Sequence, residues 1–179
     1  MSEILDLTEL GNPILREVAK EVSDLADDQV QKLIDDMLVT VVEANGVGLS
    51  APQVDRSLRV FVMASYPNPR YPDAPEIDPY EVINPEIISE SEEMEEDWEG
   101  CLSIPGIRGI VPRHKEIEVK YTDRYGREKT EVLNDFLARI FQHEYDHLEG
   151  IVFLDHLESS MDIITDKEYM KLFEEEEDE

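Results

Sequence analysis

The stretch NDFLARIFQHEYDHLEG, residues 134–150, contains two histidines four positions apart, with a glutamate directly after the first. On an α-helix, side chains four positions apart lie on one face, so His143 and His147 can reach one metal ion. Glu144 then lies close enough to move a proton on a water at that ion. The stretch therefore predicts a helix that carries a metal site.

The predicted helix begins after Asn134, which can cap it, and ends at Gly150. At about 100° per residue, both histidines and Glu144 fall in one half of the helix together with the apolar residues. These apolar residues are Phe136, Leu137, Ile140, Phe141 and Leu148. The other half is polar and contains Arg139, Gln142, Tyr145, Asp146 and Glu149. A carboxylate on the core-facing half needs a hydrogen-bond or charge partner, or else a function. Glu144 is therefore a candidate functional residue. The alternative is a core helix with two hydrogen-bonded histidines.

The charge balance limits the classes of partner. The chain has 44 acidic and 16 basic residues in 179, and a net charge of −28. This excess argues against a nucleic-acid or anionic-membrane surface and is explained by solubility or a saline habitat.

The first 11 residues do not resemble a secretory signal, and no apolar run approaches the ~20 residues of a membrane span. Cys101 is the only cysteine, so no intrachain disulfide can form, and we expect a cytoplasmic protein.

The remaining sequence predicts one domain over residues 1–173 and a disordered acidic tail over 174–179. Helices are expected over 27–45, where Gly46 can stop the helix, and over 162–173. Strands are expected over 58–63, as one or two short strands over 81–89 broken at Pro85, and in a hairpin of 117–121 and 128–133. Loops are expected over the proline-rich 65–79 and over the acidic 91–99, which carries Trp98. Because helices and strands do not alternate regularly, we predict an α+β fold with small mixed or antiparallel sheets around the histidine-bearing helix.

A catalytic metal site usually has three protein ligands, and two residues could supply the third. Glu168 follows His147 by 21 positions, about where one class of zinc proteases places a glutamate ligand. Cys101 is the other candidate, and the glycine before it allows close backbone approach.

Three motifs resemble the signatures of the peptide deformylases. They are GVGLSAPQ at residues 46–53, EGCLS at 99–103 and QHEYDHLEG at 142–150. They occur in the order and with spacing similar to those of the family, and the resemblance covers roughly residues 10–157. Ser50 and Pro52 vary within the first motif but leave its glycines and Gln53 in register.

The resemblance implies a hydrolase that removes the N-formyl group from the first methionine of new bacterial proteins. It implies a metal, Fe(II) in the cell with Zn, Ni or Co able to substitute, held together with a water by Cys101, His143 and His147. Glu144 is implied as general acid and base. Two donors to the oxyanion are implied, the side-chain amide of Gln53 and the backbone N–H of Leu102. We also hypothesise that the thiolate suits Fe(II) at the cost of oxidation, so the Fe(II) form should lose activity in air.

The resemblance also implies how a peptide binds. Val47 and Gly48 would lie along the peptide backbone, and Gly100 would let the channel approach it closely. We expect an apolar slot for the methionine, lined by Val47, Phe136 and Ile140, with ordinary core packing as the alternative. Arg108 matches a family position that holds the peptide beyond the methionine, and a solvated surface arginine is its alternative.

The acidic C-terminus departs from the family. Bacterial members are thought to approach the ribosome through a basic C-terminal helix, whereas residues 174–179 are all acidic and would be repelled by RNA. Direct contact with the ribosome is therefore in doubt. The partners that the resemblance implies are formylated nascent peptides, and we expect a monomer. His114 and His156 are expected to be bystanders.

Three alternatives remain open at this point. The first is a zinc endopeptidase that uses His143, His147 and Glu168, in which Cys101 has no function. The second is a non-catalytic metal-binding protein, in which Glu144 is dispensable. The third is a relative that acts on another small formyl amide.

Overall fold

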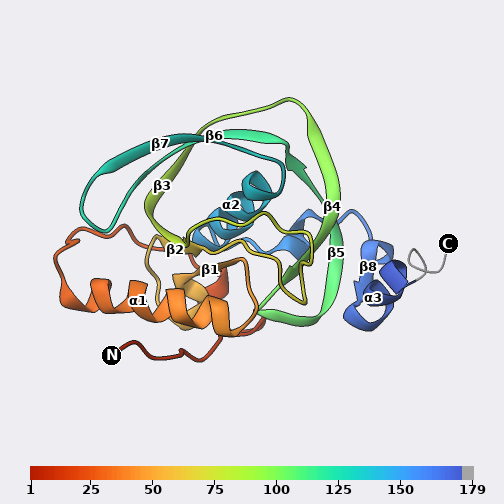
Figure 1. The fold of residues 1–179 in the computed structure, drawn as a ribbon, viewed down its shortest axis with the longest axis horizontal. Helices are drawn as coiled ribbons and strands as arrows, with labels where there is room; N and C mark the ends of the chain where they lie inside the picture. The colour runs from red at the N-terminus through yellow and green to blue at the C-terminus, as the bar shows by residue number, and fades with distance from the viewer. Residues whose placement is uncertain (175–179) are drawn as a thin grey trace.

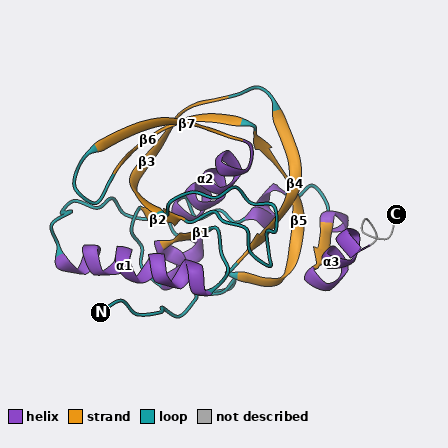
Figure 2. Ribbon diagram, in the orientation of Figure 1, coloured by secondary structure: helices purple, strands orange, loops and turns teal. Residues whose placement is uncertain are grey.

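Helix α2 (Asp135–Leu148) lies in the middle of the molecule and is surrounded by β-strands (Figure 1). The structure, a computed structural model, describes residues 1–174. Of the predicted tail 174–179, only Glu174 is described, as the last residue of α3 (Asp166–Glu174). Helix α1 (Asp28–Glu43) covers the side opposite the long strands, as the secondary-structure colouring in Figure 2 makes clear.

Two antiparallel sheets hold α2, which confirms the predicted α+β class. The larger sheet has the order β1-β2-β3-β6-β7. Its strands are β1 (Gly48–Ser50), β2 (Val60–Met63), β3 (Tyr80–Glu90), β6 (Glu116–Thr122) and β7 (Glu128–Asn134). The smaller sheet has the order β4-β5-β8. Its strands are β4 (Met94–Cys101), β5 (Ile104–His114) and β8 (Ile163–Thr165). No helix among residues 1–174 is long and apolar enough to cross a membrane.

The apolar half of α2 packs on the larger sheet as its periodicity predicts. Phe141 is fully buried and meets Phe61 of β2 edge to face, with ring centroids 5.0 Å apart. The helix ends where expected, because Gly150 adopts a left-handed φ of 72°. A side chain there would lie 2.7 Å from the carbonyl oxygen of Arg16. The predicted cap at the other end is not formed, since the Asn134 side chain makes no capping hydrogen bond.

The polar half of α2 is also covered, contrary to the simple two-faced picture. Arg139 and Gln142 are only 5% exposed. The Arg139 guanidinium donates to the carbonyl of Val111 in β5, and the Gln142 amide bonds the backbone of His114 at 2.9 and 3.0 Å. The smaller sheet thus buries these two residues of the polar half, and hydrogen bonds to strand backbone compensate their polar groups.

Several other predictions need correction. The acidic segment 91–99 is mostly strand β4, because it pairs with β5 from Met94 onward. The segment 81–89 is one strand with an irregular register at Pro85, where Asn84 takes a left-handed φ of 49°. The expected helix 162–173 begins only at Asp166, since Ile163–Thr165 pair with β5. Helix α1 ends through a left-handed Asn45 (φ 53°), not through Gly46.

The remaining predicted elements agree. Helix α1 is capped by Asp27, whose carboxylate accepts from the Gln29 N–H at 2.8 Å. Strands β6 and β7 form the predicted hairpin. Residues 65–79 contain no helix or strand and cross in front of α2 in Figure 1.

Candidate metal centre and active site

Three side chains able to bind metal meet between the two sheets. The sulfur of Cys101 and one ring nitrogen each of His143 and His147 all lie within 4.8 Å of one another. The Cys101 Sγ is 3.4 Å from His147 Nε2, and the two imidazole rings have centroids 5.1 Å apart. All three side chains are buried, with 3%, 9% and 1% exposure. Glu168, the other candidate ligand, is exposed on α3 and bonds Lys171 instead.

Local chain geometry explains how Cys101 reaches the histidines. Strands β4 and β5 are joined by the two-residue turn Leu102–Ser103, so Cys101 is the last residue of β4. The register shifts between Gly100 and Cys101, where Cys101 pairs with Ile104. Such a bulge re-aims a side chain at the end of a ladder, here toward α2.

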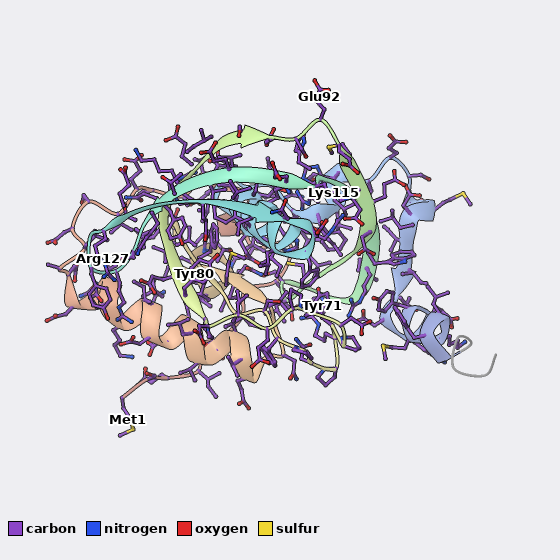
Figure 3. The ribbon with its side chains drawn as sticks, turned by 45° about the horizontal axis from the view of Figure 1, so that its top comes forward. Met1, Tyr71, Tyr80, Glu92, Lys115 and Arg127 are labelled. Atoms are coloured by element: carbon purple, nitrogen blue, oxygen red, sulfur yellow. The ribbon has the colours of Figure 1, made fainter. Side chains whose placement is uncertain are left out.

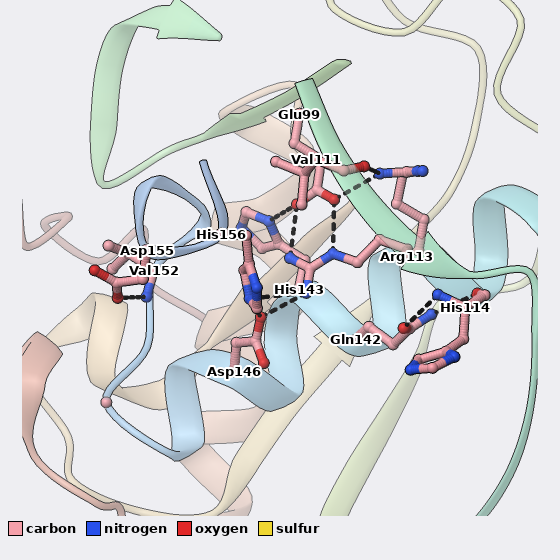
Figure 4. Close-up of polar contacts among 12 residues, drawn as sticks. Glu99, Val111, Arg113, His114, Gln142, His143, Asp146, Val152, Asp155 and His156 are labelled. Atoms are coloured by element: carbon pink, nitrogen blue, oxygen red, sulfur yellow. Dashed lines mark hydrogen bonds and ion pairs between the residues drawn. The ribbon is translucent and has the colours of Figure 1, made fainter. Parts of the chain in front are cut away.

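Glu99 holds His143 and is the main residue of the site that the sequence did not predict as functional. Its carboxylate accepts from His143 Nδ1 at 2.8 Å, from Arg113 at 2.8 and 2.9 Å and from Arg139 at 2.8 Å (Figure 4). We call Glu99, Arg113, Arg139 and His143 the Glu99 network. Because His143 Nδ1 donates to Glu99, its Nε2 is left as the metal-binding nitrogen.

The Glu99 network extends to the surface. Arg113 also pairs with Asp146 at 2.6 Å, and Asp146 contacts His156 Nε2 at 2.7 Å (Figure 4). His114 Nδ1 lies 2.7 Å from the carbonyl of Ser91 on the other side of β5. Among the described residues, neither His114 nor His156 belongs to a group of side chains able to hold a metal.

The pKa values of the two buried carboxylates, Glu99 and Glu144, are shifted in opposite directions. Burial raises the pKa of Glu99, but the charges and hydrogen bonds of Arg113 and His143 outweigh it and hold that pKa far below its usual range. Burial dominates at Glu144 and raises its pKa to about 7. Glu99 therefore stays ionised as a fixed partner, while Glu144 can exchange a proton near neutral pH.

Gly48 lets the Glu144 carboxylate approach the backbone of β1. A Cβ added at Gly48 would lie 2.7 Å from Glu144 Oε1. The other oxygen, Oε2, is buried without a hydrogen-bond partner. An unpartnered buried oxygen of this kind has an open position for a water or a substrate proton.

Gln53 is aimed at the same centre. Its side-chain oxygen accepts from the N–H and the hydroxyl of Ser50 at 2.9 and 3.0 Å. This fixes its amide nitrogen toward Cys101 Sγ at 3.5 Å and Ser103 Oγ at 3.2 Å. Leu102 is packed against Gly46, where an added Cβ would lie 2.9 Å from its Cδ1.

One cavity contains these groups. Of the residues predicted from sequence, it is lined by Val47, Gly48, Gln53, Gly100, Cys101, Leu102, Phe136, Ile140, His143 and Glu144. His147 lies behind its wall with 1% exposure. Arg108 is also buried and does not line the cavity. The lining residues that sequence reasoning missed are Arg70, Tyr71, Trp98, Glu99 and Arg139.

A buried Cys-His-His group beside a carboxylate with a raised pKa, at the end of a partly apolar cavity, defines a metal-dependent hydrolase. A sequence model of the polypeptide deformylase family matches residues 4–162. Peptide deformylase 2 of Nostoc sp. is 56% identical over 170 residues, which is 95% of each chain. The chain belongs to the polypeptide deformylase family and is a metal-dependent deformylase.

Solved structures of peptide deformylases are similar to this chain in fold. Class I type b peptide deformylase from Acinetobacter baumannii, solved with Met-Ala-Ser bound, has a TM-score of 0.85 and 46% identity and covers 88% of this chain and 100% of its own. Peptide deformylase from Synechococcus elongatus, solved with actinonin, has a TM-score of 0.79 and 40% identity and covers 88% and 81%. The endopeptidase alternative is not favoured, since Glu168 does not join the metal-capable group.

Proposed function

We propose that this enzyme removes the N-formyl group from the formyl-methionine that begins nascent proteins. The observation that carries the proposal is the meeting of Cys101, His143 and His147 at the wall of the cavity that Glu144, with its unpartnered Oε2, also lines. It is supported by the Acinetobacter baumannii relative, which was solved with Met-Ala-Ser, a peptide that begins with methionine.

The three ligands fit a divalent ion. One thiolate and two neutral imidazoles are a ligand set that would leave room for a water at a bound ion, as catalytic sites require. Because His143 Nδ1–H donates a hydrogen bond to Glu99, the ligand orientation is fixed before any ion binds. We propose Fe(II) as the ion in the cell, with Zn, Ni or Co able to substitute, because sulfur and imidazole ligands suit these metals. A bound ion would supply Lewis-acid chemistry to the formyl group and would lower the pKa of water toward neutrality.

The protein residues then position and move protons. Glu144 Oε2 accepts the proton of the attacking water and passes it to the leaving amine. A pKa of about 7 suits both directions of this transfer. The Gln53 amide and the Leu102 N–H donate to the formyl oxygen as it becomes negative, and losing one such donor typically costs about 100- to 1,000-fold in rate.

The substrate path lies along β1 and the end of β4. Val47, Phe136 and Ile140 line an apolar part of the cavity, which we propose binds the methionine side chain. Val47, Gly48 and Gly100 offer backbone on either side for the peptide. Tyr71 adds a further wall, since its ring lies 5.6 Å from that of Phe136.

The cellular setting follows from substrate and charge. Formylated nascent chains emerge in the cytoplasm, and we propose that the enzyme acts there as a monomer of one domain over residues 1–173. Its net charge of −28 disfavours direct contact with ribosomal RNA, so we propose that it meets its substrates without docking on RNA.

The test is release of formate from formyl-Met-Ala-Ser by protein prepared anaerobically with Fe(II) or Ni(II). Glu144→Ala should lose activity by at least about 100-fold while retaining metal. The matched control is Glu168→Ala, an exposed glutamate that bonds only Lys171 and whose loss should leave activity unchanged. Metal binding without formate release by the wild type would contradict the proposal and favour another small formyl amide as substrate.

Cys101→Ala separates the deformylase site from the peptidase arrangement. The variant should lose tight metal binding if Cys101 is a ligand, whereas a His143, His147 and Glu168 site would keep it. Bound metal per chain is measured after dialysis against a weak chelator.

A further inference from the structure

The loop that crosses the cavity presents two side chains to it. Asn68 forms the turn, because its side-chain oxygen accepts from the N–H groups of Arg70 and Tyr71 at 2.9 and 3.1 Å. Ser65 closes the loop by donating to the carbonyl of Pro75 at 2.6 Å. Tyr71 and Arg70 both line the cavity as a result, and Figure 3 labels Tyr71 on this loop.

Arg108 fastens this loop to the C-terminal helix. Its Nη2 donates to the carbonyl of Arg70 at 3.1 Å, and its Nε pairs with Asp166 of α3 at 3.1 Å. Its guanidinium contacts the rings of Tyr71 and Tyr169, at 5.0 and 4.2 Å from their centroids. Arg108 is 3% exposed and holds the loop against α3, although its Nη1 is buried without a hydrogen-bond partner.

Arg70 is different from every other arginine of residues 1–174. The other eight guanidinium groups each donate at least one hydrogen bond within that part of the chain. Arg70 donates none there, although the chain has 44 acidic residues against 16 basic ones. Its guanidinium N–H donors are therefore available in the cavity wall.

The Arg70 head group stands over the substrate path. A Cβ added at Gly100 would lie 3.2 Å from Arg70 Nη2, so the guanidinium covers the backbone just before the metal ligand Cys101. The Tyr71 ring beneath it, 5.6 Å from its central carbon, limits where it can move. A peptide bound along the end of β4 would therefore lie within reach of the Arg70 N–H donors.

We propose that Arg70 binds a carboxylate of the substrate peptide in the residues that follow formyl-methionine, and so gives the enzyme a preference for acidic starts. The inference rests on the proposed function. The carboxylate is either an Asp or Glu side chain or, in a short peptide, the terminal carboxylate. A planar guanidinium can bind either of these with two parallel hydrogen bonds.

The experiment measures kcat/KM for formate release on matched peptides at constant ionic strength. One arm compares formyl-Met-Glu-Ala-amide with formyl-Met-Gln-Ala-amide. A second compares formyl-Met-Ala-Glu-amide with formyl-Met-Ala-Gln-amide, and a third compares formyl-Met-Ala-Ser with its amide. The wild type should prefer the carboxylate in at least one arm by about 3- to 10-fold, the range expected for a partly exposed charge-assisted hydrogen bond.

Arg70→Gln should abolish that preference by lowering kcat/KM more on the carboxylate peptides than on the neutral ones, and Arg70→Lys should retain part of it. Arg56→Gln is the matched control, since Arg56 is exposed and bonds only the carbonyl of Asp55. Equal rates for carboxylate and amide in all three arms of the wild type would overturn the proposal, and so would a preference that survives Arg70→Gln. If no peptide releases formate, the proposed function itself fails.

Discussion

At the scale of the residue, Glu99 decides how well the site is organised before metal binds. Glu99→Gln keeps the shape but removes the charge that pairs with Arg113 and Arg139 and orients His143. Loss of such an outer partner typically weakens metal binding by about 10- to 100-fold. We expect that loss in a chelator competition assay. The control Glu149→Gln changes a half-buried carboxylate that pairs only with Arg59, and it should leave metal affinity unchanged.

Substitution of Gly48 should impair catalysis and leave metal binding intact. In Gly48→Ala the new methyl group would lie 2.7 Å from Glu144 Oε1, so the carboxylate must move. A small misplacement of a catalytic group can cost about 100-fold in rate. We expect kcat to fall by that order with metal content intact. Gly106→Ala, which meets no atom within 4 Å, gives the control for a lost glycine, although its φ of 85° adds backbone strain. A variant of Gly48 with normal kcat would show that the contact does not matter.

The sequence predicts most of the site but not the residues that orient it. His143, Glu144 and His147 follow from helical spacing alone, and the resemblance brings in Cys101 and Gln53. Glu99 and Arg70 could not be found this way, because their importance depends on which side chains meet across the two sheets. Arg108 illustrates the same limit. Its family position suggests substrate contact, whereas its neighbours in this chain, Tyr71 and Tyr169, bury it.

At the scale of the element, the hairpin of β6 and β7 depends on one carboxylate. Asp123 accepts from the N–H groups of Tyr125 and Arg127 at 2.9 Å each and from the Arg127 guanidinium at 2.7 Å. Burial raises the pKa of Asp123, but these bonds outweigh it, so its pKa lies below the usual value. Its contribution to stability is therefore present at neutral pH. It is lost as the pH falls through the unfolded-state value near about 4 and then through the folded-state pKa.

Asp123→Asn should lower the free energy of unfolding at pH 7 by about 0.5–1 kcal/mol, since the amide keeps an acceptor but loses the charge. The difference from wild type should shrink when urea unfolding is repeated at pH 4. Asp78→Asn, which alters an exposed loop carboxylate, should show neither effect. A difference that stays constant or grows toward pH 4 would contradict the assignment.

The elements that sequence reasoning misjudged share a cause. Segment 91–99 looks like a loop because it is acidic, yet β4 forms there because β5 supplies a partner over its whole length. Strand β8 is three residues long and exists only through its pairing with β5. Periodicity detects elements that bury one face, such as α1 and α2, and does not detect strands that are fixed by backbone pairing alone.

At the scale of the whole molecule, charge and metal act on stability in opposite ways. With a net charge of −28, the acidic side chains repel one another in the compact folded state, and this repulsion lowers its stability. Raising NaCl from about 0.05 to 0.5 M shortens the screening length from about 14 to 4 Å, so we expect Tm to rise. An equally concentrated neutral osmolyte serves as the comparison, and a Tm that falls with salt would mean that attractive ion pairs dominate instead.

The bound metal should tie the two sheets together. Cys101 ends β4 in the smaller sheet, whereas His143 and His147 lie on α2, which packs on the larger one. An ion that binds only the folded chain stabilises it by about 2.7 kcal/mol when its free concentration is 100 times the Kd. For a chain of this size that free energy corresponds to an increase of about 5–11 °C in Tm.

Chelation should therefore lower Tm by this amount in wild type and in Glu144→Gln, which keeps all three ligands. Cys101→Ala should already melt near the chelated temperature and respond little to chelator. If the chelator shift were as large in Cys101→Ala as in wild type, the metal would bind without the cysteine, and the sheets would not be joined through this site.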